Sequence, residues 1–290
     1  MNWVNGDVCV SHPRSPWSPQ GDEWVLVHAR LDQVNGNYPA YGELKPEHYR
    51  TYLAAKHEFD LKSAYEIIDR CAAPPIIEIM ARFVGKLDTT PILVFPHLSF
   101  DDEDGSDGQK PLGQLPNNAI PFAFAEFLAI QLGCEVNQTI IQASRVGRSK
   151  ITTWLRFLCQ PSFEGKVEID RPYILLDDVV TTGGTFAALR SYIIQHGGRV
   201  VGTAALAHKN GVHQKFAIAD QTAGVLKSLY GSDLDSYWTR TVGHGPNALT
   251  EAEAEFLAFH ARTEWASVPR GTQLLQCLRE RINRAAATGG

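Results

Sequence analysis

The sequence predicts an α/β protein: an open, mostly parallel sheet with helices on both faces, extended by mainly helical additions at its N- and C-terminal ends. Short, continuous apolar runs alternate with amphipathic segments, and such runs suit strands buried on both faces of a parallel sheet. One run leads through a glycine-rich turn into a helix, which is where open α/β sheets bind ligands. We expect residues 1–75 to form an N-terminal extension or hood, 76–211 the α/β core and 212–290 a C-terminal helical extension.

Length and composition agree with an ordinary globular protein. The 290 residues are 44% hydrophobic and 20% charged, which excludes a disordered chain and a collagen. Lysine and arginine number 27 against 32 acids, a formal net charge of −5. Because phosphate neutralisation drives DNA binding, this acidic excess argues against a nucleic-acid partner, although it leaves room for a local basic site.

Cysteine usage and apolar patterning favour a cytoplasmic protein with no membrane partner. The five cysteines are scattered, odd in number and never spaced C-x-x-C, so structural zinc is not expected and a reducing compartment is the simpler interpretation. The first residues lack a basic start followed by an apolar run, so no signal peptide is expected. No stretch approaches the roughly 20 apolar residues of a membrane span.

The N-terminal region combines a β-like, turn-rich start with helices. The run at 24–29 predicts a strand, and the Asn35-Gly36 pair is a turn signal. Apolar residues recur at helical spacing over 46–72, with Asp60 as a point of division, and again over 76–84.

Strands and helices alternate through the core. Apolar runs predict strands at four places: residues 91–96, 139–143, 173–176 and 199–206. Helices are predicted over 118–132, before Gly133, and over 186–193, before a Gly-Gly pair. Beyond residue 211 the chain is mostly helical, with a capping box from Thr250 to Glu253 and a last helix over 273–286.

The segment 174–185 carries the chemistry. An apolar run delivers two adjacent acids to its carboxyl end, and the sequence Thr-Thr-Gly-Gly-Thr then opens a helix. The amides of Gly183 and Gly184, at a helix N-terminus, attract anions through unsatisfied donors and the helix dipole. Neutral hydroxyl donors come from Thr181, Thr182 and Thr185. The turn therefore predicts a phosphate cradle.

The acid pair predicts a different kind of partner. Asp177 and Asp178 would repel a phosphate beside them, but they suit the hydroxyls of a neutral sugar slightly further along, so the segment describes a ribose 5-phosphate site. Either half alone also suits a plain strand-to-helix connection in which the acids cap the turn. Neither a P-loop nor a Rossmann glycine motif occurs at this junction. We expect the acids to carry little core packing, because they end a strand.

Four apolar residues, two acids, two apolar residues and then T-T-G-G-T resemble the signature of type I phosphoribosyltransferases, which bind 5-phosphoribosyl-1-pyrophosphate (PRPP). The resemblance covers roughly residues 76–210 in element order and is sharp over 173–190. It implies that Asp177 and Asp178 contact the ribose hydroxyls, directly or through Mg²⁺, and that residues 181–185 hold the 5-phosphate. Mg²⁺ usually binds one or two carboxylates plus substrate oxygens, so no cage built from protein alone is needed.

Two further elements of that family have counterparts here. Residues 95–99 take the place of a loop that grips pyrophosphate, which makes His97 a candidate PRPP-binding residue. The acidic run at 101–107 departs from the family pattern, and is either an inserted, solvated loop or a metal-recruiting segment. The basic stretch 144–171 takes the place of a mobile loop that closes over pyrophosphate.

That basic stretch supplies the remaining candidate residues. The resemblance implies catalytic roles for Arg145 and Lys150 and a PRPP-binding role for Arg148, and Arg156 lies in the same stretch. In family members that act on 6-oxopurines an acid stands where Thr181 stands here, so Thr181 argues against a hypoxanthine or guanine substrate. The T-T-G-G-T version looks more like orotate- or competence-type members.

The acceptor is not predicted by any motif. In the family it is chosen by a variable hood, which here would come from residues 1–75, 212–290 or both. Aromatic residues that could stack on a base, or simply belong to the core, are Trp24, Tyr38, Tyr41 and Trp238.

Three functions follow as hypotheses. The first is a phosphoribosyltransferase that uses PRPP and Mg²⁺ on an unidentified nitrogen acceptor and releases pyrophosphate. The second is a PRPP- or nucleotide-sensing regulator that keeps the cradle without turnover, and the third is a scaffold whose flanks bind a protein. The sequence leaves the oligomeric state open, a homodimer among the options.

Overall fold

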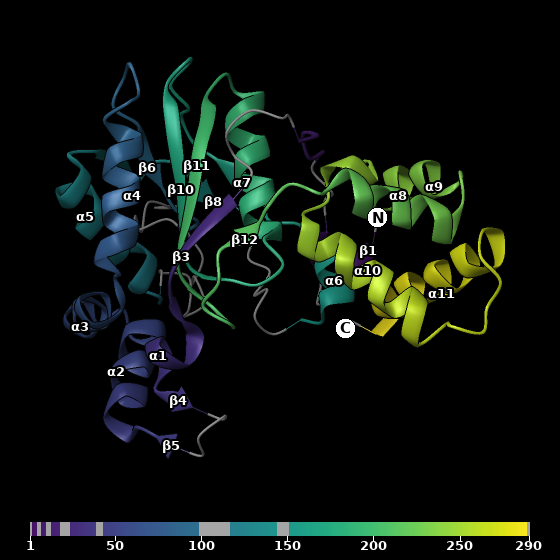
Figure 1. Cartoon of the computed structure of the whole chain (residues 1–290), viewed down its shortest axis with the longest axis horizontal. Helices are drawn as coiled ribbons and strands as arrows, with labels where there is room; N and C mark the ends of the chain where they lie inside the picture. The colour runs from purple at the N-terminus through teal and green to yellow at the C-terminus, as the bar shows by residue number, and fades with distance from the viewer. Residues whose placement is uncertain are drawn as a thin grey trace, which may run out of the picture.

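A six-stranded sheet forms the centre of the computed structural model (Figure 1), which describes residues 2–4, 7–9, 13–17, 24–38, 43–98, 117–143 and 151–288. The strand order is β12-β3-β11-β10-β6-β7; five neighbouring strands run parallel, and β12 pairs antiparallel to β3 at one edge. The strands are β3 (Trp24–Arg30), β6 (Ile92–Val94), β7 (Glu135–Asn137), β10 (Pro172–Val180), β11 (Arg199–His208) and β12 (Gln214–Lys215). The predicted open, mostly parallel sheet is confirmed.

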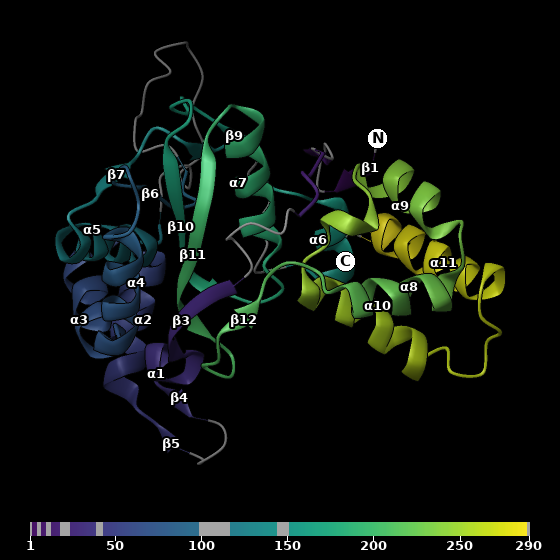
Figure 2. The same cartoon turned by 45° about the horizontal axis from the view of Figure 1, so that its top comes forward.

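Helices cover both faces of this sheet, as Figure 2 shows. On one face lie α4 (Pro74–Val84) and α5 (Ile120–Leu132), and on the other lies α7 (Gly184–Gln195). The helix α3 (Leu61–Cys71) packs on α5, and α2 (Pro46–His57) packs on α3. Because side chains alternate along a strand, Ile174 and Leu176 pack with the α3–α5 side, whereas Leu175 packs with α7. All three side chains are buried, as continuous apolar runs require.

Local signals explain where the N-terminal helices begin and end. Asp60 caps α3 by accepting a 3.1 Å hydrogen bond from the Ser63 amide, which confirms the division of the helical pattern there. The Asn-Gly pair does not form a hairpin turn: Gly36, at a φ of 71°, ends the helix α1 (Leu31–Asn35). A short hairpin of β4 (Asn37–Tyr38) and β5 (Glu43–Leu44) follows.

The prediction of a core strand over residues 139–143 is wrong. The run at 139–143 contains β8 (Ile141–Gln142), which pairs antiparallel with β9 (Phe163–Glu164) outside the main sheet. The parallel edge strand is β7 instead, in which Glu135 is exposed and the other two residues are only partly buried. An edge strand buries less of its surface, so Glu-Val-Asn carries no continuous apolar run.

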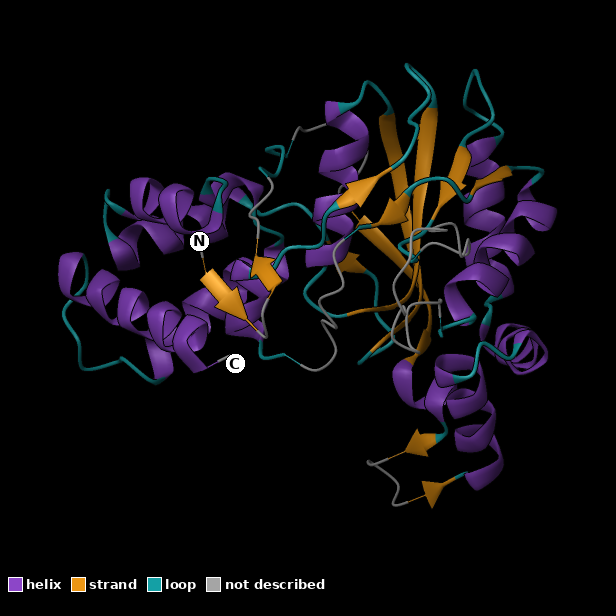
Figure 3. Ribbon diagram, turned by 180° about the vertical axis from the view of Figure 1, so that it is seen from behind, coloured by secondary structure: helices purple, strands orange, loops and turns teal. Residues whose placement is uncertain are grey.

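A second group of helices lies beside the sheet and has its own core (Figures 1 and 3). Its members are α6 (Thr153–Leu158), α8 (Asp220–Tyr230), α9 (Leu234–Val242), the 3-10 helix η2 (Pro246–Ala248), α10 (Glu251–Thr263) and α11 (Thr272–Thr288). We call this group the C-terminal unit. The capping box at Thr250 and Glu253 is confirmed. Trp238 is fully buried in this core, so it is not placed to stack on a base.

The N-terminal segments connect the two parts. Strands β1 (Asn2–Val4) and β2 (Asp7–Cys9) form a hairpin. Residues 13–17 run along α7, where the Ser15 amide donates to Ser191 at 2.9 Å. Although β3 lies within the main sheet and α6 within the core of the C-terminal unit, the three-region division of the chain stays a prediction.

Two sequence expectations about the chain as a whole can be compared with the structure. None of the helices in the described part of the chain combines the length and apolar composition needed to cross a bilayer. The cysteines Cys71, Cys134 and Cys277 are free thiols, whereas Cys159 is disulfide-bonded, which their scattered spacing did not predict.

Candidate functional site

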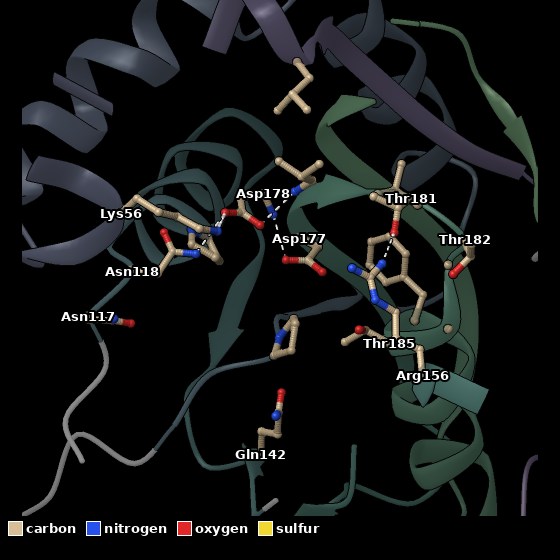
Figure 4. A pocket seen from close by; sticks show the side chains of 18 of the residues that line it. Lys56, Asn117, Asn118, Gln142, Arg156, Asp177, Asp178, Thr181, Thr182 and Thr185 are labelled. Carbon is tan, nitrogen blue, oxygen red and sulfur yellow. Dashed lines mark hydrogen bonds and ion pairs between the residues drawn. The ribbon is translucent and has the colours of Figure 1, made fainter. Parts of the chain in front are cut away.

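A cavity of about 490 Å³ opens where β10 ends and α7 begins (Figure 4). This is the carboxyl end of a central parallel strand, where open α/β sheets bind ligands. The predicted acid pair and phosphate cradle line it together: Asp177, Asp178, Thr181, Thr182, Gly183, Gly184 and Thr185. Further walls come from α2, from the entry to α5 and from α6.

The phosphate end of the cavity is formed by the start of α7. Gly183, at a φ of 76°, precedes the first helical residue, Gly184. A Cβ on Gly183 would lie 2.9 Å from a ring carbon of Phe216 and 3.3 Å from the Thr250 methyl group, so only glycine fits this turn. The first turn of α7 carries no acid. Its free amides therefore present an uncompensated anion-binding helix end to the cavity.

Arg156 of α6 brings a positive charge to the same end. Its Nη1 donates to Thr181 Oγ1 at 3.4 Å (Figure 4). Its Nε is buried and has no hydrogen-bond partner among the described residues. A planar guanidinium with a spare donor suits a phosphate, which accepts several such bonds.

Asp178 differs from the exposed acid that the sequence suggested. It is only 5% exposed, and its Oδ2 accepts bonds from Lys56 Nζ and, at 2.9 Å, from Asn118 Nδ2. Its Oδ1 accepts a 2.8 Å bond from the amide of Val179. Burial alone would raise the pKa of Asp178, but the charge of Lys56 and these hydrogen bonds lower it below its ordinary value. The expectation that this acid carries little packing is therefore wrong.

Asp177 lies in a different environment although it is the next residue. Its Oδ1 accepts a 2.8 Å bond from the amide of Asp178, and its side chain points to the middle of the cavity (Figure 4). Burial, and then the negative charge of Asp178, raise the pKa of Asp177 well above its ordinary value. The two acids therefore differ in role: Asp178 is ionised and held by protein groups, whereas Asp177 faces the cavity.

Sequence reasoning missed the end of the cavity beyond the acids. Tyr52 and Lys56 reach it from α2, and Asn117 and Asn118 precede α5. Lys56 stands 122 positions before its partner Asp178, and nothing in its local pattern marks it. Arg156 carried a signal, because it belongs to the basic stretch after the second predicted strand.

Of the other predicted site residues, the structure describes His97, and it does not line the cavity. His97 is buried and stacks on Phe95 at 4.7 Å, while its Nδ1 lies 2.7 Å from the Leu98 carbonyl; it is not among the lining residues, although its neighbour Pro96 is. Burial lowers the pKa of His97. Further predictions lie outside the described residues: Tyr41, Ser99, the acidic run 101–107, Arg145, Arg148 and Lys150.

The donor set fits Mg²⁺ only as an ion shared with a ligand. Among the described residues no group of three or more His, Cys, Asp or Glu side chains could hold a metal. Both oxygens of Asp178 already accept hydrogen bonds, so Asp177 is the better-placed of the two predicted metal ligands. One carboxylate plus ligand phosphates is an ordinary set for Mg²⁺.

Comparisons with known proteins give sequence relatives and structural neighbours of different kinds. No family model matches the chain. It is 31% identical over 247 residues to protein TraN of Escherichia coli, covering 85% of this chain and 49% of that protein. It is 42% identical over 182 residues to an uncharacterized protein of Haemophilus influenzae, covering 63% and 34%. The chain thus spans about half or less of the length of these relatives.

Solved structures similar to this chain include phosphoribosyltransferases. Adenine phosphoribosyltransferase of Leishmania donovani matches with a TM-score of 0.28 and 16% identity, covering 51% of this chain and 57% of that one. A hypoxanthine-guanine phosphoribosyltransferase of Bacillus anthracis matches with a TM-score of 0.29 and 13% identity, covering 50% and 68%. Because these TM-scores and identities are low, they carry no argument about function. Any such argument must come from the residues of the cavity.

Proposed function

We propose that the cavity binds PRPP and that the chain transfers ribose 5-phosphate from it to a nitrogen acceptor, releasing pyrophosphate. One observation carries the proposal: a single cavity combines an anion-binding helix end and Arg156 with a pair of carboxylates beyond them. A phosphorylated sugar has the matching order of groups, with phosphate at one end and hydroxyls beside it.

Each part of the cavity has a role in this proposal. The amides of residues 183–185 and the guanidinium of Arg156 bind the 5-phosphate. Asp177 accepts hydrogen bonds from the ribose hydroxyls and is oriented by the Asp178 amide, while Lys56 and Asn118 hold the Asp178 carboxylate in place. Tyr52, whose pKa is raised by burial, lines the end left for the acceptor.

The proposed reaction exchanges one bond at the anomeric carbon. The acceptor nitrogen donates its lone pair to this carbon as the bond to the pyrophosphate oxygen breaks, and that oxygen keeps the electron pair. The nitrogen then loses a proton to solvent. The carboxylates stabilise the positive charge that develops on the sugar. When bound, Mg²⁺ would neutralise charge on the leaving pyrophosphate, with Asp177 among its ligands.

A specific observation favours a second candidate, a PRPP-sensing protein without turnover. Asp178 is already occupied by Lys56 and Asn118, which leaves one carboxylate facing the cavity. Such a site could bind the phosphorylated sugar and yet stabilise a cationic sugar poorly.

The test is pyrophosphate release from PRPP and Mg²⁺ with a panel of nitrogen heterocycles and amines. Release with one acceptor class, abolished by Asp177→Asn and kept by the exposed control Asp233→Asn, is the expected result. A rise in melting temperature with PRPP but no release would favour the sensor, because any ligand of the native state raises its apparent stability. No rise at millimolar PRPP would refute both and favour a scaffold.

A further inference from the structure

We propose that Arg14 and Glu253, which do not line the cavity, are positioning residues for its phosphate end. They stand 239 positions apart, yet Arg14 Nη1 donates to Glu253 Oε2 at 2.6 Å and Nη2 to Oε1 at 3.0 Å. Their side chains are 1% and 3% exposed. This inference depends on the proposed function for its ligand, but its structural part can be tested separately.

One arm of the pair leads to Arg156. Arg14 Nη2 also donates to Gln160 Oε1 at 2.6 Å. The side-chain Nε2 of Gln160 in turn donates to the backbone carbonyls of Arg156 and Phe157, each at 2.9 Å. These carbonyls belong to the end of α6, where free acceptors need partners. The position of the Arg156 backbone is therefore fixed through Gln160 by Arg14.

A second set of hydrogen bonds connects the pair to the turn around Gly183. Glu253 Oε2 accepts a 3.1 Å bond from the Thr250 amide, and Thr250 Oγ1 donates to the carbonyl of Thr182. Arg14 Nη2 also lies 3.4 Å from the carbonyl of Gly184. The carbonyls on both sides of Gly183 are thus held from behind, so the amides in this turn face the cavity in a fixed arrangement.

Stability alone does not account for such a pair. Removing two charges from water is costly, and a buried ion pair often stabilises a fold no better than well-packed apolar residues. What a bidentate guanidinium-carboxylate pair adds is a fixed geometry. That geometry joins the N-terminal segment, α6, α7 and α10 at one point behind the phosphate end. A binding site depends on such support, because small displacements of its donors weaken it.

The first test compares Arg14→Met with Leu278→Ala, which opens a cavity in the core of the C-terminal unit and removes none of the hydrogen bonds of the pair. We expect Arg14→Met to weaken ribose 5-phosphate binding by about tenfold in calorimetry, the order of one lost charge-assisted hydrogen bond. In Arg14→Met, the ability of unphosphorylated ribose to compete for the site should stay unchanged. In Leu278→Ala, the affinity for ribose 5-phosphate should stay unchanged. In an Arg156→Met background, Arg14→Met should reduce the affinity for ribose 5-phosphate by a smaller factor, because the guanidinium that Arg14 positions through Gln160 is already absent.

The second test needs no ligand. Hydrogen exchange at the Ala187 amide, which donates to the Gly183 carbonyl at 3.0 Å, should be at least about tenfold faster in Arg14→Met than in Leu278→Ala, because local opening sets that rate. Gln160→Leu, which leaves the ion pair intact, provides a milder variant that affects only the Arg156 arm. Equal exchange and equal affinity in Arg14→Met and Leu278→Ala would overturn the inference. A native chain that fails to bind ribose 5-phosphate, with the exchange difference preserved, would refute the proposed function and support the positioning role.

Discussion

Replacing Asp178 by asparagine is expected to cost stability, whereas the same change at Asp177 is expected to cost little. Asp178 holds the ammonium of Lys56, and the two side chains are 7% and 24% exposed. Asparagine keeps the shape but removes the charge that Lys56 needs. Among the described residues no cation forms an ion pair with Asp177, and burial raises the pKa of Asp177, so a neutral amide suits its place.

The magnitude follows from the burial of the pair. Breaking a fully buried ion pair costs about 3–5 kcal/mol, and an exposed pair contributes about 0–1 kcal/mol. Because Lys56 keeps some contact with water, we expect Asp178→Asn to lower the free energy of unfolding by about 2 kcal/mol. Asp177→Asn should lower it by less than about 1 kcal/mol, since asparagine can still accept the bond from the Asp178 amide.

Urea unfolding of the full chain measures both changes, and a double-mutant cycle with Lys56→Met isolates the pair. Removing both partners should recover most of the loss, because no buried charge is then left alone. Calorimetry should still show weaker ribose 5-phosphate binding in each single acid variant. Equal unfolding free energies for Asp177→Asn and Asp178→Asn would refute this division of roles.

Three further predictions concern the turn, the cation and two buried histidines. Gly183→Ala should lower stability by about 1–3 kcal/mol, because a residue with a Cβ is strained at positive φ and meets a ring, and ribose 5-phosphate binding should fall with it; unchanged unfolding curves would contradict the reasoning. Arg156→Met should weaken ribose 5-phosphate binding by about 2 kcal/mol, while the more distant Arg171→Met should not; equal losses in calorimetry would remove Arg156 from the site. Burial lowers the pKa of His28 and His244 to about 4, so both are neutral in the native state and protonated on unfolding below their ordinary pKa. Their stabilisation is complete above about pH 6.5 and is lost as the pH falls toward 4, by about 2 kcal/mol for each at pH 5; His244→Gln should flatten this part of the stability curve, and a curve of unchanged slope would count against it.

The junction between β10 and α7 could be predicted because its signals are local. The apolar run, the two acids and the glycine turn are contiguous, and each acts on its immediate neighbours. The strand extends through Val180, further than the apolar run alone indicated. The acids and the glycine turn therefore line the cavity together.

The rest of the site could not be predicted because it depends on tertiary contacts. Lys56 and Asn118 meet Asp178 from 122 and 60 positions away. The helix α6 lies within the basic stretch 144–171, where no helix was predicted, and it is stabilised by packing of Trp154 and Phe157 into the core of the C-terminal unit. The edge strand β7 was missed because its polar residues follow no apolar pattern.

A crystal structure of the full chain with ribose 5-phosphate tests the central claim most directly. The account predicts the phosphate on the amides of residues 183–185 beside Arg156, with the sugar hydroxyls on Asp177. A ligand bound with its phosphate toward Lys56, or bound elsewhere on the protein, would contradict it.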